Sequence, residues 1–171
     1  SPQIATTGRW GRATFAPLAD NKDQLRLIET GDTLTAATLF PGAPGEGLAL
    51  EATAYRGLIE VRADGEGGIT AINIVNLEDY LKGVVPNELS PQAYPQIEAL
   101  KAQAVAARTY ALSNRGQYKL KGFDLCATPA CQVYRGRSSE SPLSDQAVDE
   151  TRGQSASYRG RLINALYTST S

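Results

Sequence analysis

The sequence of 171 residues contains no histidine. Histidine is the usual base beside serine and cysteine nucleophiles and the commonest protein ligand of metals. Its absence excludes Ser-His and Cys-His catalytic arrangements and most catalytic zinc sites. The formal net charge is −1, which provides no general attraction for polyanions, so we expect no nucleic-acid partner.

Long apolar runs are also missing. No stretch approaches the ~20 residues of a membrane-spanning helix, so we expect no transmembrane segment in this chain. The first residues, Ser1 to Ile4, lack the charged start and apolar core of a secretory signal peptide. The apolar fraction of 42% is ordinary for a globular protein, and the length suits one domain or one domain with a small extension.

The first 75 residues have the pattern of short strands separated by turns. Residues 41–45 and 64–68 are rich in glycine, proline and aspartate, which favour turns. We expect residues 1–45 to form a β-rich N-terminal extension and residues 46–171 to form the main domain, although residues 41–45 also suit a long loop. The expected strands are residues 25–28, 48–52, 58–62 and 69–74.

The middle of the chain has the pattern of helices. Asn76 suits the N-cap of a short helix over residues 77–84, which Pro86 then breaks. A long helix is expected from about Pro95 to Asn114, with a shorter one near residues 144–150 capped by Ser144. The core stripe expected on the long helix is Ile97, Leu100, Ala104, Ala107 and Ala111. Residues 154–158 and 161–168 are expected to form a hairpin around Arg159 and Gly160. The predicted fold class is α+β, a mainly antiparallel sheet packed on one long central helix with short accessory helices.

Several motifs, in a consistent order, resemble a known family. They are residues 76–85, Glu88, 98–110, 124–126, 131–136 and 147–153. Together they resemble the stage II sporulation D domain, also called SpoIID or LytB-like, over roughly residues 55–171. That family cleaves the glycan strands of peptidoglycan or assists enzymes that do. The resemblance implies peptidoglycan glycan strands and a cell-wall amidase as partners, and an exported protein of the periplasm or cell wall whose signal or anchor is absent from this chain.

The resemblance assigns catalysis to Glu88. In a lytic transglycosylase one glutamate serves as acid and then base, and the product carries an anhydro-muramic end. A carboxyl group among apolar neighbours suits a general acid, but from the residues alone Glu88 is also a surface glutamate that caps the next helix. The alternative function is a non-catalytic peptidoglycan-binding module that enhances an amidase. A generic β-rich adhesion domain fits the first 75 residues but not the helix motif.

Six further side chains are candidates for substrate binding. Arg108 has a planar fork that suits sugar hydroxyls, whereas Lys101 is equally a helix-surface residue paired with Glu98. In an extended segment Gln132 and Tyr134 would share one side, although Tyr134 also suits a core position. The six candidates are Lys101, Gln103, Arg108, Gln132, Tyr134 and Tyr167.

Cys126 and Cys131 stand five positions apart in a loop-rich segment. In an exported protein this spacing favours a local disulfide worth about 2 kcal/mol. Two thiolates alone cannot complete a tetrahedral zinc site, although Asp124 could be a third ligand, and some relatives use a histidine that this chain lacks. We therefore expect no metal and no cofactor, with free thiols as the remaining alternative. Because the family segment around Tyr167 normally continues further, we also expect the domain to be incomplete after Ser171.

Overall fold

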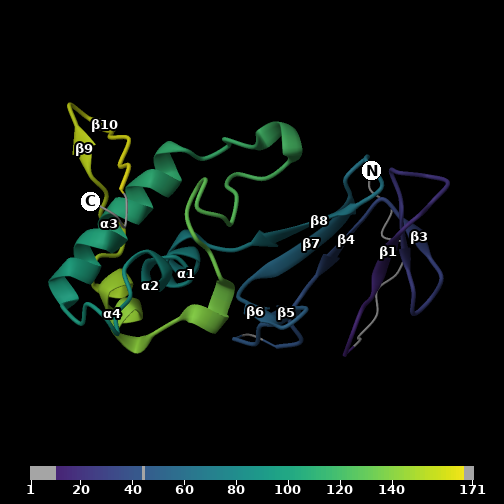
Figure 1. The fold of residues 1–171 in the computed structure, drawn as a ribbon, viewed down its shortest axis with the longest axis horizontal. Coiled ribbons are helices and arrows are strands. Elements are labelled where there is room, and N and C mark those ends of the chain that lie inside the picture. The colour runs from purple at the N-terminus through teal and green to yellow at the C-terminus, as the bar shows by residue number, and fades with distance from the viewer. Residues whose placement is uncertain (1–10, 44, 168–171) are drawn as a thin grey trace. The chain divides into compact units, whose positions relative to one another are not determined.

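The computed structural model describes residues 11–43 and 45–167, and it combines α-helices with antiparallel sheets (Figure 1). The chain divides into two compact units. One comprises residues 1–48 and 57–74, and the other comprises residues 49–56 and 75–171. Residues 57–74 group with the N-terminal strands, and the domain boundary at residue 45 stays a prediction. Over the described residues, no helix combines the length and apolarity needed to cross a bilayer.

The first unit contains two three-stranded antiparallel sheets. β1 (Phe15–Pro17), β2 (Leu25–Leu27) and β3 (Thr33–Leu34) form one sheet, with Leu25 and Leu27 buried. The second sheet has β7 (Leu58–Ala63) between β4 (Ala36–Leu39) and β8 (Ile69–Ile74). Three of the expected strands correspond to β2, β7 and β8, whereas β1, β3 and β4 were not expected from the sequence.

The second unit contains the helices. Its α-helices among the described residues are α1 (Leu77–Lys82), α2 (Val85–Glu88), α3 (Ile97–Ser113) and α4 (Pro142–Glu150). Two short 3₁₀ helices are η1 (Lys119–Lys121) and η2 (Gly136–Ser139). Two small sheets complete it: β5 (Leu48–Leu50), which starts at the unit boundary, with β6 (Thr53–Tyr55), and β9 (Ser157–Tyr158) with β10 (Arg161–Leu162).

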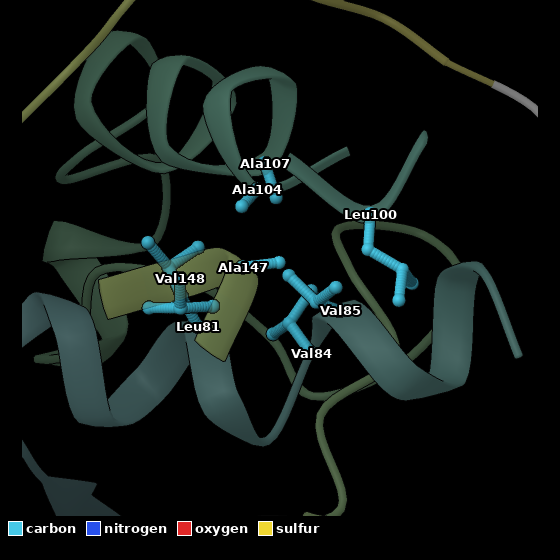
Figure 2. Packing of buried hydrophobic residues seen from close by; sticks show 8 residues of the cluster. All are labelled: Leu81, Val84, Val85, Leu100, Ala104, Ala107, Ala147 and Val148. Atoms are coloured by element: carbon cyan, nitrogen blue, oxygen red, sulfur yellow. The ribbon is translucent and has the colours of Figure 1, made fainter. Parts of the chain in front are cut away.

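The core of the second unit lies between helices. Small and branched side chains from α1, α2, α3 and α4 meet there without a sheet (Figure 2): Leu81, Val84, Val85, Leu100, Ala104, Ala107, Ala147 and Val148. The expected stripe of α3 is confirmed, since Leu100, Ala104, Ala107 and Ala111 are buried. The expectation that this face packs on a sheet was wrong, because its alanines admit the neighbouring helices closely instead.

The helix ends follow capping chemistry with small shifts from expectation. Asn76 is the N-cap of α1 and accepts a hydrogen bond of 2.9 Å from the Asp79 amide, as predicted. Pro86 lies in the first turn of α2 instead of breaking the chain, because a missing N–H is harmless there. The N-caps of α3 and α4 are Gln96 and Ser141, so Pro95 and Ser144 do not occupy the expected positions.

Candidate functional site

Glu88 is the last residue of α2, and its position follows from how that short helix is anchored. The buried Val85 holds α2 in the helical core, and Glu88 itself is half-buried. The backbone N–H of Val133 donates a hydrogen bond of 2.7 Å to Oε1 of Glu88. Within the described residues, Oε2 has no hydrogen-bond partner. One carboxylate oxygen is thus fixed by the protein and the other remains available.

Gln132 lies one residue before that amide and is almost fully buried, at 1% exposure. Its Oε1 accepts a hydrogen bond of 3.1 Å from the Tyr80 hydroxyl. Its Nε2 donates to the backbone oxygen of Ala107 at 3.2 Å and to the Tyr167 hydroxyl at 2.6 Å. These contacts fix the orientation of the amide, because a buried amide is stable only when its donors and acceptors are satisfied.

Two phenols therefore meet at Gln132. Burial raises the pKa of Tyr80 and of Tyr167, and the nearby charge of Glu88 raises both further. Both phenols are consequently protonated at neutral pH and lie within electrostatic range of Glu88. We call the four residues Tyr80, Glu88, Gln132 and Tyr167 the Glu88 cluster.

Gln103, on α3, borders this cluster. Its side chain lies near the Tyr167 phenol, whose pKa it lowers slightly against the larger effect of burial. The geometry falls short of a hydrogen bond, and Nε2 of Gln103 is buried without a partner in the described part of the chain. A buried donor without an acceptor is costly, so this amide is suited to donate a hydrogen bond to an oxygen atom of a ligand.

Tyr134 contacts the cluster through a ring. Its ring centroid lies 5.0 Å from that of Tyr80 and 6.0 Å from that of Tyr55. Since Gln132 and Tyr134 both contact Tyr80, they share one side of their segment, as the alternation in sequence suggested. Burial raises the pKa of Tyr134, so this phenol is also protonated at neutral pH.

Two of the sequence candidates are engaged elsewhere. Arg108 is 1% exposed and pairs with Glu78, so it does not border an open cleft beside Glu88 as we expected. Lys101 forms ion pairs of 2.8 Å with Glu98 and 2.7 Å with Glu150, in keeping with its helix-surface interpretation. The substrate-binding roles proposed for these two residues have no support in their contacts.

The candidate site includes two positions, Tyr80 and Val133, that the sequence alone did not indicate. Tyr80 belongs to the family motif of residues 76–85, and this membership was the signal available for it. Val133 contributes only its backbone N–H, which no side-chain pattern reveals. Both positions become visible once the segment after Cys131 is placed against α1 and α2.

The predicted disulfide is present between Cys126 and Cys131, whose Cα atoms lie 5.6 Å apart. It closes the loop that leads directly into Gln132 and Val133, and so restrains the segment that orients Tyr80 and Glu88. Among the described residues, no three or more histidine, cysteine, aspartate or glutamate side chains gather as a metal site would require.

A known protein family matches the part of the chain that contains Tyr80, Glu88 and Gln132. Residues 65–158 match the family model SpoIID, described as stage II sporulation protein. The chain is 46% identical over 99 residues to an uncharacterised protein of Brachyspira hyodysenteriae. It is 44% identical over 90 residues to the amidase enhancer of Bacillus subtilis, and 35% identical over 116 residues to the stage II sporulation protein D of the same organism.

These three alignments cover 57%, 53% and 59% of this chain, respectively. They cover only 26%, 12% and 33% of the relatives. The chain therefore spans a third or less of the length of the curated relatives it matches. The matched region contains three members of the Glu88 cluster, Tyr80, Glu88 and Gln132.

Proposed function

Because the chain belongs to the SpoIID family, we propose that it is a peptidoglycan lytic transglycosylase that uses Glu88 as both acid and base. A role at the bacterial cell wall agrees with the family and with the names of its relatives. The cleaved bond and the role of Glu88 are the proposal. The observation that carries it is the fixed carboxylate of Glu88, whose second oxygen has no partner among the described residues, beside two protonated phenols.

The proposed reaction needs one carboxyl group and no water. Protonated Glu88 donates its proton from Oε2 to the glycosidic oxygen, and the bond from the anomeric carbon to that oxygen breaks. A hydroxyl group of the same muramyl ring then attacks the anomeric carbon and closes the anhydro bridge. Its proton passes to the ionised Glu88, which restores the starting state.

The neighbours of Glu88 support this cycle. The Val133 amide holds Oε1 in place, so Oε2 can exchange a proton without a change of side-chain position. The buried Gln103 amide provides an unpartnered donor for an oxygen atom of the sugar. The phenols of Tyr80 and Tyr167 offer apolar faces and polar edges, a combination that suits a sugar ring.

The test is incubation of the 171-residue chain with purified peptidoglycan, followed by mass analysis for anhydro-muramic ends. Glu88→Gln should keep the melting temperature and reduce the rate by at least ~100-fold, because an amide cannot donate the proton. Glu66→Gln, at an exposed turn residue, is the matched control and should leave the rate unchanged. A Glu88→Gln rate within a few-fold of the parent would refute the acid role.

A second function has its own support, the 44% identity to a protein named amidase enhancer. In this alternative the same surface binds glycan strands without cleavage, and a cell-wall amidase is the partner. Amidase activity should then rise when the chain is added, and Glu88→Gln should preserve that rise while no anhydro ends form. The two functions are distinguished by whether the parent chain releases anhydro ends without the amidase.

We also propose that the protein works outside the cytoplasm, in the periplasm or cell wall. The Cys126–Cys131 disulfide supports this location, because disulfides persist in oxidising compartments. Cell fractionation followed by thiol labelling without reductant tests it. Labelled thiols in a cytoplasmic fraction would contradict the proposal.

A further inference from the structure

The second unit has a hollow of about 380 Å³ that the Glu88 cluster does not line. This volume lies at the lower end of the roughly 300–1,000 Å³ of small-ligand sites. The lining consists entirely of polar and aromatic residues: Thr53, Tyr55, Tyr134, Arg135, Ser138 and Ser139. A hollow without aliphatic side chains is suited to a polar ligand with a ring face, not to a lipid or an apolar peptide.

The walls of the hollow are held together by contacts between β6 and η2. The amide of Ala54 donates a hydrogen bond of 3.0 Å to Oγ of Ser138. Gly136 lies so close to β6 that a Cβ atom there would be 2.5 Å from the backbone oxygen of Ala54. Arg56, just after β6, pairs with Glu140 through two contacts of 2.6 Å. The hollow is therefore already formed before any ligand arrives.

The polar groups of this wall differ in what they can still bind. Oγ of Ser139 accepts from Asn87 at 2.8 Å and donates to Gly136, so it has a structural role. Arg135 is exposed, and its guanidinium has no ion pair or hydrogen bond within the described residues. Its backbone N–H donates a hydrogen bond of 3.2 Å to the backbone oxygen of Gly83, which fixes the backbone from which this side chain extends.

Two guanidinium groups lie beside the hollow, those of Arg56 and Arg135. The carboxylate of Glu140 is neutralised by Arg56, whereas Arg135 has no acidic partner in the described part of the chain. A guanidinium presents paired donors that match a carboxylate, and a nearby tyrosine ring can pack on the face of a sugar. Tyr134 lines the hollow and also packs on Tyr80 of the Glu88 cluster. One glycan strand can therefore contact both the hollow and the Glu88 cluster.

We propose that this hollow is a subsite for a carboxylate-bearing amino sugar, in which Arg135 pairs with the carboxylate and Tyr55 packs on the ring. The inference rests on the proposed action on glycan strands and adds a determinant of substrate choice to it. The ligand chemistry is a hexosamine that carries a free carboxylate, as the muramic acid unit does where no stem peptide is attached to its lactyl group. A neutral hexosamine lacks the group that Arg135 recognises.

The experiment measures binding separately from cleavage. Ligand-observed NMR on the 171-residue chain would compare N-acetylmuramic acid, N-acetylglucosamine and the dipeptide D-alanyl-D-alanine. N-acetylmuramic acid should bind at least ~10-fold more tightly than the other two, and Arg135→Gln should remove that preference. Arg161→Gln, on the β9–β10 hairpin, removes the same charge elsewhere and should leave the preference intact. Equal melting temperatures would show that both variants fold.

Each outcome either supports or overturns the proposed subsite. Equal binding of the two sugars, unchanged binding by Arg135→Gln, or tighter binding of the dipeptide would overturn it. Should the parent show the preference but release no anhydro ends, the subsite stands and the transglycosylase proposal fails. Where the chain does cleave, Arg135→Gln should raise KM for glycan strands with little change in kcat, because the contact forms equally in the ground and transition states.

Discussion

Arg108 and Glu78 form a buried, two-point ion pair that connects α3 to α1. Nε of Arg108 lies 3.0 Å from Oε1 of Glu78, and Nη2 lies 2.7 Å from Oε2. The guanidinium also donates to the backbone oxygens of Val148 at 3.2 Å and Gln154 at 3.0 Å. Burial alone would raise the pKa of Glu78, but the hydrogen bonds and charge of Arg108 lower it below its ordinary value.

This pair predicts a large effect on stability. Arg108→Ala should reduce the free energy of unfolding by about 3–5 kcal/mol, because it leaves a buried carboxylate without its partner. Arg115→Ala is the matched control: that side chain is 76% exposed and lies 3.6 Å from Asp124, so its loss should cost less than ~1 kcal/mol. Urea denaturation measures both. A stable Arg108→Ala variant with impaired glycan binding would instead restore the substrate role expected from sequence.

Asp145 should make stability depend on pH. Burial, followed by the charge of Glu140, raises the pKa of Asp145 to about 6, and its Oδ1 is buried without a partner in the described residues. The folded state thus holds this proton more tightly than the unfolded chain. The stabilisation from this group is fully present below about pH 4 and is lost as pH rises through about 6.

Relative to Asp145→Asn, the parent should therefore lose stability between about pH 4 and pH 7. Denaturation curves of both proteins across this range measure the difference. Asp149→Asn serves as a control: a hydrogen bond from Lys82 lowers the pKa of Asp149, so its difference from the parent should be nearly constant over this range and change only below about pH 4, with the opposite sign. A constant difference between the parent and Asp145→Asn would contradict the assignment.

Gly136 should tolerate no side chain. Its φ is +60°, and a Cβ atom would lie 2.5 Å from the Ala54 oxygen and 2.7 Å from a ring carbon of Tyr55. Gly116 has a similar φ of +80° with nothing within 4 Å, so it isolates the backbone effect. Gly116→Ala should cost about 1–2 kcal/mol, and Gly136→Ala distinctly more. Equal melting temperatures for the two variants would show that β6 and η2 move apart readily.

Loss of the disulfide should act on both stability and the site. Replacing Cys126 and Cys131 with serine should lower the free energy of unfolding by about 2 kcal/mol, since the closed loop is short. Because Gln132 and Val133 follow directly, glycan cleavage should fall further than the change in folded fraction explains. Activity assays with and without reductant, at a temperature where both forms are folded, measure this. Unchanged cleavage would mean that the segment holds its position without the bridge.

Local patterns in the sequence predicted much of the second unit. The alanine-rich stripe of α3 and the cap at Asn76 depend on residues within one or two helical turns. The hairpin around Arg159 and Gly160 has positive φ at both turn residues, 50° and 76°, as a tight two-residue hairpin requires. The alternation of Gln132 and Tyr134 also reported correctly that they share a side.

Such local patterns do not show which element packs against each helix face or which distant residue pairs with each side chain. Periodicity shows that one side of α3 is apolar, but not whether a sheet or other helices cover it. Arg108 pairs with Glu78, thirty positions earlier, and Glu88 with the amide of Val133, forty-five positions later. No pattern in the intervening residues indicates either of these pairings.

The sequence by itself determined the two longest helices, the cap at Asn76 and that Glu88 belongs to a family motif, and it favoured the Cys126–Cys131 pairing, because these properties reside in neighbouring residues or in a matched pattern. Only the tertiary structure decided that Arg108 forms a structural ion pair with Glu78 and that the backbone N–H of Val133 fixes the carboxylate of Glu88. It alone decided that Arg135, which has no ion-pair partner among the described residues, lies beside a polar hollow. The physical reason is that burial and hydrogen-bond partners depend on distant segments, and packing chooses among side chains that sequence leaves equivalent.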